Sequence, residues 1–293
     1  MTKCILCLKD KPISKSHIIP KFVSDWIKET SATGLLRSGW NPNKRVQDTI
    51  KNPLLCIDCE KEFSVFENYF AKNIFYPFHR GEKNFTYNDT LRKFILSICW
   101  RTLHLQFTEI KDTAPRNVFS IVSKAIEEWS KYLANDRDDF EPYECHIFFL
   151  DNIKNSYSLK LPDRFESYLF RSIDATFAIG KEFKSEKDIM FVYVKLPGII
   201  LISSIFPSKI PDMEKTKVEN SGILSPPQHI YQKDIGSFII HRSEEAFKRR
   251  LSDKQMGKIL ESIYKNPERA IKSKSFEAIL AERRRKGIKD SWF

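Results

Sequence analysis

The sequence predicts an α+β protein in which a small zinc-stabilised module precedes a larger body of helices and strands. Two Cys-x-x-Cys pairs flank a polar segment near the N-terminus. Apolar residues recur at helical spacing from about residue 60 to 133, and β-branched and aromatic residues dominate from about 143 to 206. Helical spacing returns towards the C-terminus. We therefore expect a zinc-binding domain at 1–76 and an α+β domain at 77–293.

The cysteines have the spacing of metal ligands. Four of the six form two Cys-x-x-Cys pairs, Cys4 with Cys7 and Cys56 with Cys59. Two thiolate pairs on tight turns can meet tetrahedrally around one Zn²⁺, although 48 residues separate them. The intervening segment has little apolar periodicity, so bound metal would supply its stability. The remaining cysteines lie in apolar sequence and are expected to be plain buried residues: Cys99 and Cys145.

Three helices are expected between the second cysteine pair and residue 133. The first spans Glu60–Phe75 and is ended by Pro77. The second covers about 90–111, with Asp89 as its N-cap. The third begins at Thr113 to Pro115 and is expected to bury these residues: Val118, Phe119, Val122, Ile126, Trp129 and Leu133.

Strands are expected after residue 140, in a mainly antiparallel sheet. The candidate strands are Cys145–Asp151, Phe170–Ile179, Asp188–Leu196, Ile199–Phe206 and Ile235–His241. Pro197 and Gly198 predict a tight hairpin turn. A helix is expected to begin at Ser243 and to continue to about Lys265, followed by a basic helix at about 275–286.

The charge distribution favours a polyanionic partner. The formal net charge is +11. It is concentrated at the two ends, with 10 Lys and Arg against 6 Asp and Glu in residues 1–60, and 14 against 8 in residues 243–293. The longest apolar run is too short and too polar to cross a membrane, and no signal segment is visible. We therefore expect a soluble cytoplasmic protein without a membrane partner.

The order of motifs around the cysteines resembles a known family. A first knuckle is followed by Ser16-His17-Ile18-Ile19-Pro20, then by Asn52-Pro53-Leu54-Leu55-Cys56-Ile57-Asp58-Cys59-Glu60 and a helical pattern. This order is similar to the HNH, or ββα-metal, endonucleases with a zinc-stabilised core. The resemblance covers about residues 1–70 and implies an HNH or treble-clef-like fold with structural Zn²⁺.

The resemblance also implies catalytic roles. A histidine at the end of the first strand activates water, an asparagine before the second knuckle steadies the loop, and a residue just after that knuckle holds a divalent ion. By position these roles fall on His17, Asn52 and Glu60. Their chemistry is coherent, because an imidazole can accept a proton near neutral pH and oxygen ligands hold Mg²⁺ or Mn²⁺.

The motif departs from the family directly before the histidine. The family has an acidic metal ligand there, and this chain has Ser16. Glu60 is also an unusual choice at its position. The long insertion between His17 and Asn52 supplies Asp48 as a candidate for the missing acid, and Glu67 is a second candidate.

Two clusters of cations are candidates for phosphate contacts. They are Lys44 with Arg45, and the run Arg283, Arg284, Arg285 and Lys286. Each can equally be a solvated surface.

The function expected from these features is metal-dependent hydrolysis of nucleic acid, with DNA favoured over RNA and a setting in bacterial or phage defence. One alternative is a non-catalytic zinc finger that binds nucleic acid or a protein, with Ser16 and Glu60 as the features that favour it. Another places the function in the sheet at about 143–241, as a ligand sensor. A protein partner or a homo-oligomer is compatible with each.

Overall fold

A four-stranded antiparallel sheet forms the centre of the protein. The computed structural model describes residues 3–110, 112–150, 161–180 and 189–288. The strands of the sheet are β6 (Cys145–Phe149), β7 (Asp174–Ile179), β8 (Met190–Leu196) and β9 (Ile199–Phe206). Their spatial order is β6-β9-β8-β7, and every neighbouring pair is antiparallel. The expected antiparallel sheet is therefore confirmed.

The hairpin between β8 and β9 turns at the predicted Pro197 and Gly198. Leu196 pairs with Ile199 across the turn. Gly198 has φ +71°, and a Cβ built on it would lie 2.8 Å from the Phe78 ring. Only glycine satisfies both the backbone conformation and this close approach.

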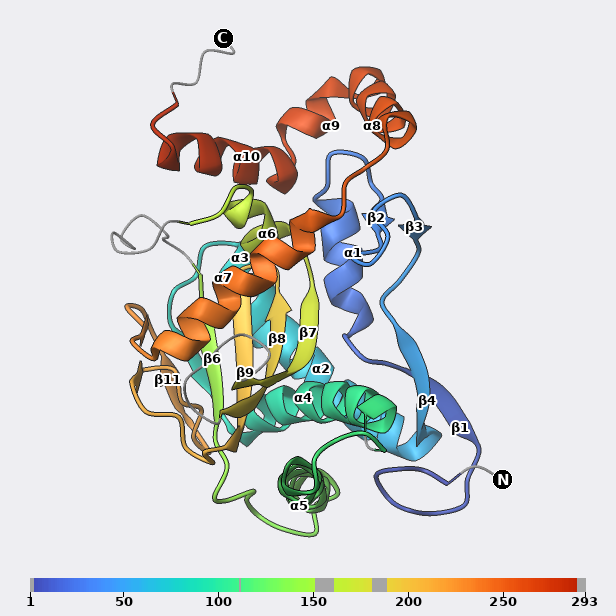
Figure 1. Cartoon of the computed structure of the whole chain (residues 1–293), viewed down its shortest axis with the longest axis vertical. Coiled ribbons are helices and arrows are strands. Elements are labelled where there is room, and N and C mark those ends of the chain that lie inside the picture. The colour runs from blue at the N-terminus through green and yellow to red at the C-terminus, as the bar shows by residue number, and fades with distance from the viewer. Residues whose placement is uncertain (1–2, 111, 151–160, 181–188, 289–293) are drawn as a thin grey trace.

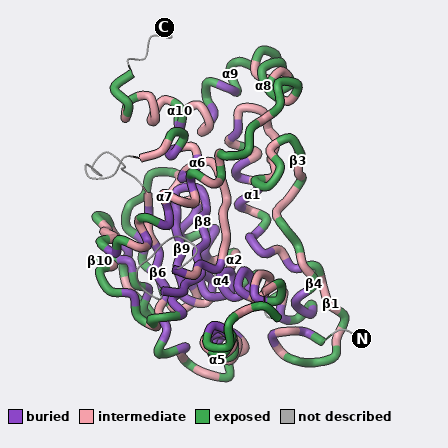
Figure 2. Tube along the Cα trace, in the orientation of Figure 1, coloured by how far each residue is buried: buried purple, intermediate pink, exposed green. Residues whose placement is uncertain are grey.

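Helices cover both faces of the sheet, as Figure 1 shows. One face packs against α4 (Asp89–Ile110), and the other against α6 (Phe165–Arg171) and α7 (Lys233–Lys248). Val192 and Val194 belong to the core on the α4 side, whereas Phe191 and Tyr193 belong to the core on the α7 side. Side chains alternate along a strand, so a strand covered on both faces is apolar throughout. Burial is accordingly concentrated in β8, β9 and α4 (Figure 2).

The N-terminal module is a two-stranded hairpin followed by a helix. In it, β1 (Ile13–His17) pairs antiparallel with β4 (Lys51–Cys56), which leads directly into α2 (Ile57–Phe70). The long connection between the strands contains α1 (Lys21–Glu29), β2 (Leu36–Arg37) and β3 (Arg45–Val46). The module shares one hydrophobic core with α4 and the sheet, and this core runs across the predicted domain boundary after residue 76. The division into two domains stays a prediction.

Two predicted elements differ from the structure in their bounds, and one differs in the burial of a residue. Pro77 does not end the expected helix Glu60–Phe75. It is continued by η1 (Ala71–Phe75), a π-helical turn, and α3 (Tyr76–His79), because proline is tolerated in the first turn of a helix. Phe119 was expected to be buried in α5 (Arg116–Leu133), but 44% of it is exposed. The start of the expected strand Phe170–Ile179 belongs to α6 instead, and the strand begins at Asp174.

The expected strand Ile235–His241 is wrong. These residues form part of α7, whose N-cap Gln232 accepts a hydrogen bond from the Asp234 backbone N–H. Ile235, Phe238 and Ile239 have the spacing of a helix face and pack on the second face of the sheet. Ser243 therefore lies inside a helix and does not begin one. Three of the expected bounds lie outside the described residues: the helix end at Lys111, the strand end at Asp151 and the strand start at Asp188.

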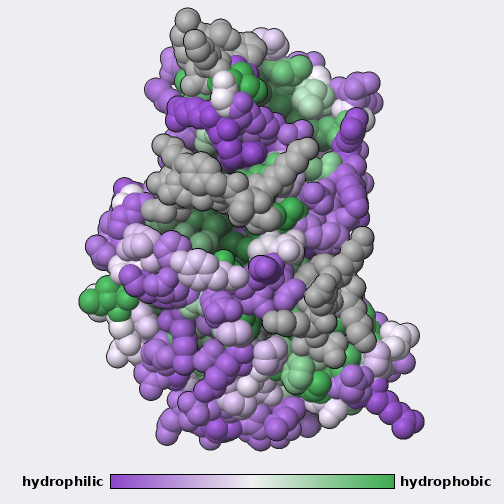
Figure 3. All heavy atoms as spheres, turned by 60° about the vertical axis from the view of Figure 1, so that its left-hand side comes forward, coloured by the Kyte–Doolittle hydropathy of each residue, from purple (hydrophilic) through white to green (hydrophobic). Residues whose placement is uncertain are grey.

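The C-terminal segment forms three further helices, α8 (Asp253–Lys265), α9 (Pro267–Ile271) and α10 (Lys274–Arg285). Short strands complete the described structure: β5 (Phe85–Tyr87), β10 (Met213–Glu214), β11 (Gly222–Leu224) and β12 (His229–Ile230). The face of the molecule in Figure 3 is mainly hydrophilic, interrupted by hydrophobic patches. Within the described part of the chain, no helix combines the length and apolar character that a membrane span needs.

Candidate zinc centre and adjacent histidine site

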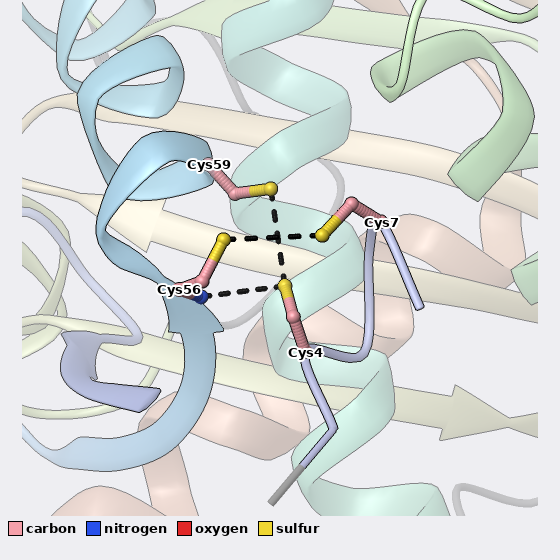
Figure 4. A group of neighbouring side chains, drawn as sticks. All are labelled: Cys4, Cys7, Cys56 and Cys59. Atoms are coloured by element: carbon pink, nitrogen blue, oxygen red, sulfur yellow. Dashed lines mark hydrogen bonds between the residues drawn. The ribbon is translucent and has the colours of Figure 1, made fainter. Parts of the chain in front are cut away.

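The four cysteines predicted to bind zinc converge on one point. The ligand atoms of Cys4, Cys7, Cys56 and Cys59 all lie within 4.8 Å of one another. The Sγ atoms of Cys4 and Cys59 are 3.8 Å apart, as are those of Cys7 and Cys56. Tetrahedral zinc with Zn–S bonds of about 2.3 Å places its sulfurs ~3.8 Å apart. The cluster therefore has the size of a Cys₄ zinc site, and Figure 4 shows the sulfurs facing one another.

Local backbone structure presents these sulfurs. Cys4 and Cys7 lie on a turn in which the Leu8 N–H donates to the Cys4 carbonyl over 2.9 Å, and Leu8 has φ +57°. Cys56 ends β4, and Cys59 lies in the first turn of α2. The Cys56 N–H donates to the Cys4 sulfur over 3.3 Å. The first pair is thus held against the strand–helix junction that carries the second pair.

The electrostatics of the cluster favour a bound cation. Burial raises the pKa of Cys4, but backbone N–H groups, led by that of Cys56, outweigh it and lower the pKa to about 7. Burial and the neighbouring thiols Cys56 and Cys4 raise the pKa of Cys59 well above its ordinary value. Four crowded thiols cannot all ionise without a compensating charge. A divalent cation would supply that charge and allow all four cysteines to ionise to thiolate ligands.

The predicted base, His17, is paired with an acid from the insertion. His17 Nε2 lies 2.7 Å from Asp48 Oδ2. Lys51 donates to the same carboxylate over 2.9 Å, while the Ser24 hydroxyl and the Thr49 N–H donate to Oδ1. Burial by itself raises the pKa of Asp48, but the hydrogen bonds from His17 and Lys51 outweigh it and hold the pKa well below its usual range. Asp48 is therefore a carboxylate that only accepts hydrogen bonds, which requires Nε2 of His17 to carry the proton.

Glu60 lies against Ser16, on the other face of the hairpin. The Ser16 hydroxyl donates to Glu60 Oε1. Across β1 and β4, Ser16 pairs with Asn52 and His17 pairs with Lys51. Successive side chains on a strand point to opposite faces, so Ser16, Asn52 and Glu60 share one face, whereas His17 shares the other with Lys51 and its partner Asp48. The structure thus places Glu60 at the serine and Asp48 at the histidine.

The candidate ligands of a second metal ion do not form a closed set. Across the described ranges, the four cysteines are the one group of three or more His, Cys, Asp or Glu ligand atoms that all lie within 4.8 Å of one another. His17, Asp48 and Glu60 therefore do not converge as tightly as that. Both oxygens of Asp48 already accept hydrogen bonds, so its geometry suits it to orient His17.

Arg101 contacts the site, although its sequence context beside Trp100 predicts only a packing role. It lies on α4 with 1% of its surface exposed. Its Nη1 donates to the His17 backbone carbonyl over 2.6 Å and lies 2.8 Å from Glu67 Oε1. Glu67, a predicted alternative ligand, is thus the counter-ion of a buried arginine. A buried cation within an apolar helix face is a sequence signal for such a role, because it requires an acid or carbonyl partner.

Replacing Arg101 with alanine should destabilise the whole protein. The change leaves the Glu67 carboxylate and the His17 carbonyl without their donor. We expect a loss of about 3 kcal/mol in the free energy of unfolding, measured by urea titration. Lys124→Ala, at an exposed position on α5, is the control and should change it by less than about 0.5 kcal/mol. Equal stability of the two variants would contradict the assigned contacts.

The two predicted phosphate-binding clusters differ in what they contact. Lys44 and Arg45 are exposed at the start of β3, three to four residues before Asp48. Arg285 instead forms an ion pair with Glu166 of α6, and Lys286 lies 2.7 Å from Asp163. These contacts fasten α10 to the body of the protein. A role of the Arg283–Lys286 run in phosphate binding stays a prediction.

Comparisons of the chain with protein-family models, with curated proteins and with solved structures find no match. The resemblance to HNH endonucleases therefore remains one of motif order.

Proposed function

We propose that the protein is a metal-dependent endonuclease of the HNH type, with a structural zinc ion in its Cys₄ cluster. The observation that carries the proposal is the His17–Asp48 pair at the end of β1, joined to a hairpin and helix that the four cysteines hold together. A histidine oriented by a carboxylate is a recurrent arrangement for proton abstraction. About a fifth of each side chain is exposed, which leaves the pair open to substrate.

His17 would act as the general base. Asp48 accepts a hydrogen bond from the Nε2–H group, so Nδ1 of the neutral ring has the lone pair that takes a proton from water. Arg101 holds the backbone carbonyl of the same residue, and Ser24 and Lys51 hold Asp48. These contacts keep the imidazole in one orientation without contacting the substrate.

Glu60 would hold the divalent ion on the opposite flank. Mg²⁺ retains several waters and is bound in many enzymes by one or two carboxylates together with substrate phosphate, so a single acid is a sufficient protein contribution. When bound, the ion stabilises charge on the phosphate and the leaving oxygen. Ser16 and Glu60 lie on one face of the hairpin and His17 on the other. A phosphodiester that lay across the strand end would have the general base, His17, on one side. Its leaving group would lie on the other side, near Glu60.

Nucleic acid is the substrate that the charge distribution suits. Lys44 and Arg45 are exposed on the insertion that also carries Asp48, and the protein has a net charge of +11. DNA is proposed ahead of RNA because of the resemblance to HNH enzymes. A setting in bacterial or phage defence rests on the same analogy.

A non-catalytic zinc finger that binds nucleic acid is the second candidate. It is favoured by the open ligand set around Glu60 and by Ser16 at the position of the family's acid. If this alternative is right, the protein should bind DNA through Lys44 and Arg45 and should not cleave it with any divalent ion.

Cleavage of plasmid DNA and of RNA, with Mg²⁺ and with Mn²⁺, tests the two proposals. We expect the wild type to nick DNA. Glu60→Gln should need a metal concentration at least tenfold higher than the wild type for half-maximal cleavage. Glu62→Gln, exposed on the same helix, is the matched control and should behave like the wild type. Binding in a mobility-shift assay without cleavage of either substrate would support the finger and overturn the nuclease.

A further inference from the structure

A cavity of about 510 Å³ lies between the N-terminal module and the C-terminal helices. Trp26 of α1 and Tyr76 and His79 of α3 supply aromatic walls. The C-terminal boundary comes from α10, whose Lys274 backbone N–H donates to the Thr30 carbonyl of α1 over 2.9 Å. The volume falls within the range of about 300–1,000 Å³ typical of small-molecule sites. None of the residues proposed for phosphodiester cleavage contributes to it.

The aromatic walls are pre-organised. The Trp26 and His79 rings stack with centroids 3.9 Å apart, and Phe75 packs edge-on against both. Arg171 lies over the Trp26 ring at 5.3 Å and donates to the Thr30 hydroxyl. A planar ligand would therefore meet rings whose positions are already determined by packing.

Three cations surround the aromatic residues. Lys72 projects from the π-helical turn η1, and no ion-pair partner for it is found in the described part of the chain. Arg80 and Lys274 pair with Glu82 and Glu277 through exposed contacts of 3.1 and 2.8 Å. Exposed ion pairs of this kind contribute little stability, so both cations can turn to an anion in the cavity. Among the described residues, none that lines the cavity is acidic.

His79 presents an unused hydrogen-bond acceptor. Its Nε2 is buried and has no hydrogen-bond partner among the described residues. Burial lowers the pKa of His79 to about 3 and outweighs the Pro197 backbone, which acts in the opposite direction. A neutral imidazole has one acceptor nitrogen, and Nε2 is the ring nitrogen that can offer it to a ligand. A buried acceptor without a hydrogen bond lowers the stability of the folded protein, and a ligand N–H or O–H would supply the missing bond.

We propose that the cavity formed by Trp26, Lys72, Tyr76, His79, Arg80 and Lys274 binds a nucleotide. The base would occupy the aromatic part and donate a hydrogen bond to His79 Nε2, and the phosphate would contact the three cations. A simple anion would use the cations alone, and an uncharged aromatic molecule would use the walls alone. Only a ligand that combines a ring, a donor and an anion uses every group that the cavity offers.

Isothermal titration calorimetry of the full-length protein with AMP, GMP, CMP and UMP tests the proposal. No divalent ion is added, so metal-dependent cleavage does not contribute to the signal. We expect at least one of them to bind with Kd below about 100 µM, and its nucleoside and inorganic phosphate to bind at least tenfold more weakly. Lys72→Ala/Lys274→Ala should weaken binding at least tenfold, and His79→Phe should weaken it while preserving ring stacking.

Lys124→Ala/Lys258→Ala removes two exposed lysines that do not line the cavity and serves as the matched control. Thermal melting of each variant verifies that it is folded. Absence of binding by all four nucleotides at about 1 mM would overturn the proposal. Equal affinity for the nucleotide and its nucleoside, equal affinity for inorganic phosphate, or an equal effect of the control pair would overturn it as well. Because no cleavage is measured, these outcomes are separate from those of the nuclease test.

Discussion

Replacing Cys59 with serine is expected to lower the midpoint of thermal unfolding by about 10 °C, since loss of a structural metal site costs ~4 kcal/mol or more. Cys59 is buried in the first turn of α2, and its sulfur lies 3.8 Å from that of Cys4. The cysteine cluster joins the N-terminal turn to the strand–helix junction, and the core of this module is continuous with that of α4. Loss of the cluster should therefore lower the stability of the protein beyond the first 60 residues. Calorimetry measures the midpoint, and mass spectrometry measures the metal content.

Asp58→Ser is the matched control for this variant. Asp58 lies between the second pair of cysteines, is exposed, and contacts Lys11 through a surface ion pair. We expect the control to retain one zinc ion per chain and to unfold within ~2 °C of the wild type. A Cys59→Ser protein with unchanged metal content and midpoint would show that the cluster is not a zinc site. Chelation of the wild type should reproduce the effect of the variant.

Replacing His17 with alanine is expected to reduce DNA cleavage at least about 100-fold, because general-base catalysis contributes about 10²- to 10⁴-fold. The backbone contact with Arg101 involves the carbonyl and survives the change, so the fold should be preserved. Single-turnover rates at saturating Mg²⁺ or Mn²⁺ measure the loss. Metal dependence should not change, because Glu60 lies on the opposite face of the hairpin.

Asp48→Asn separates the orienting role from that of the base. An asparagine retains the size of Asp48 but lacks the charge that holds the proton on Nε2. We expect a smaller reduction in rate than for His17→Ala, together with a shift in the pH profile of cleavage. Unchanged cleavage by His17→Ala would remove the general-base assignment, whatever Asp48→Asn does. An Asp48→Asn effect confined to metal affinity would make Asp48 a ligand instead.

The cysteine cluster could be predicted from the sequence because the turn that carries each pair is local. Each Cys-x-x-Cys pair forms its own turn, and the spacing within a pair is enough to place its two sulfurs on the same side of that turn. The helix after Cys59 and the hairpin at Pro197 and Gly198 were predicted for the same reason, since a helix stripe and a proline–glycine turn are short-range patterns. Local patterns failed at Ile235–His241, where a β-rich composition hid a helix face.

The partners of the functional residues were decided by the tertiary structure. Asp48 was selected from the insertion as a metal ligand, but only the folded insertion brings it to His17, with Ser24 of α1 on its second oxygen. The alternation of β1 separates the Glu60 contact from the His17 contact, although Ser16 and His17 are adjacent in the sequence.

Arg101 reaches His17 from 84 residues away. Contacts of such separation depend on how the module packs against α4, and no local pattern specifies that packing. The cavity of Trp26, His79 and Lys274 likewise exists only because α10 returns to the end of α1. The sequence by itself therefore determined the four cysteines of the candidate zinc centre and most helices and strands. The fold alone decided which acid contacts the histidine and where the cavity lies, because both depend on long-range packing.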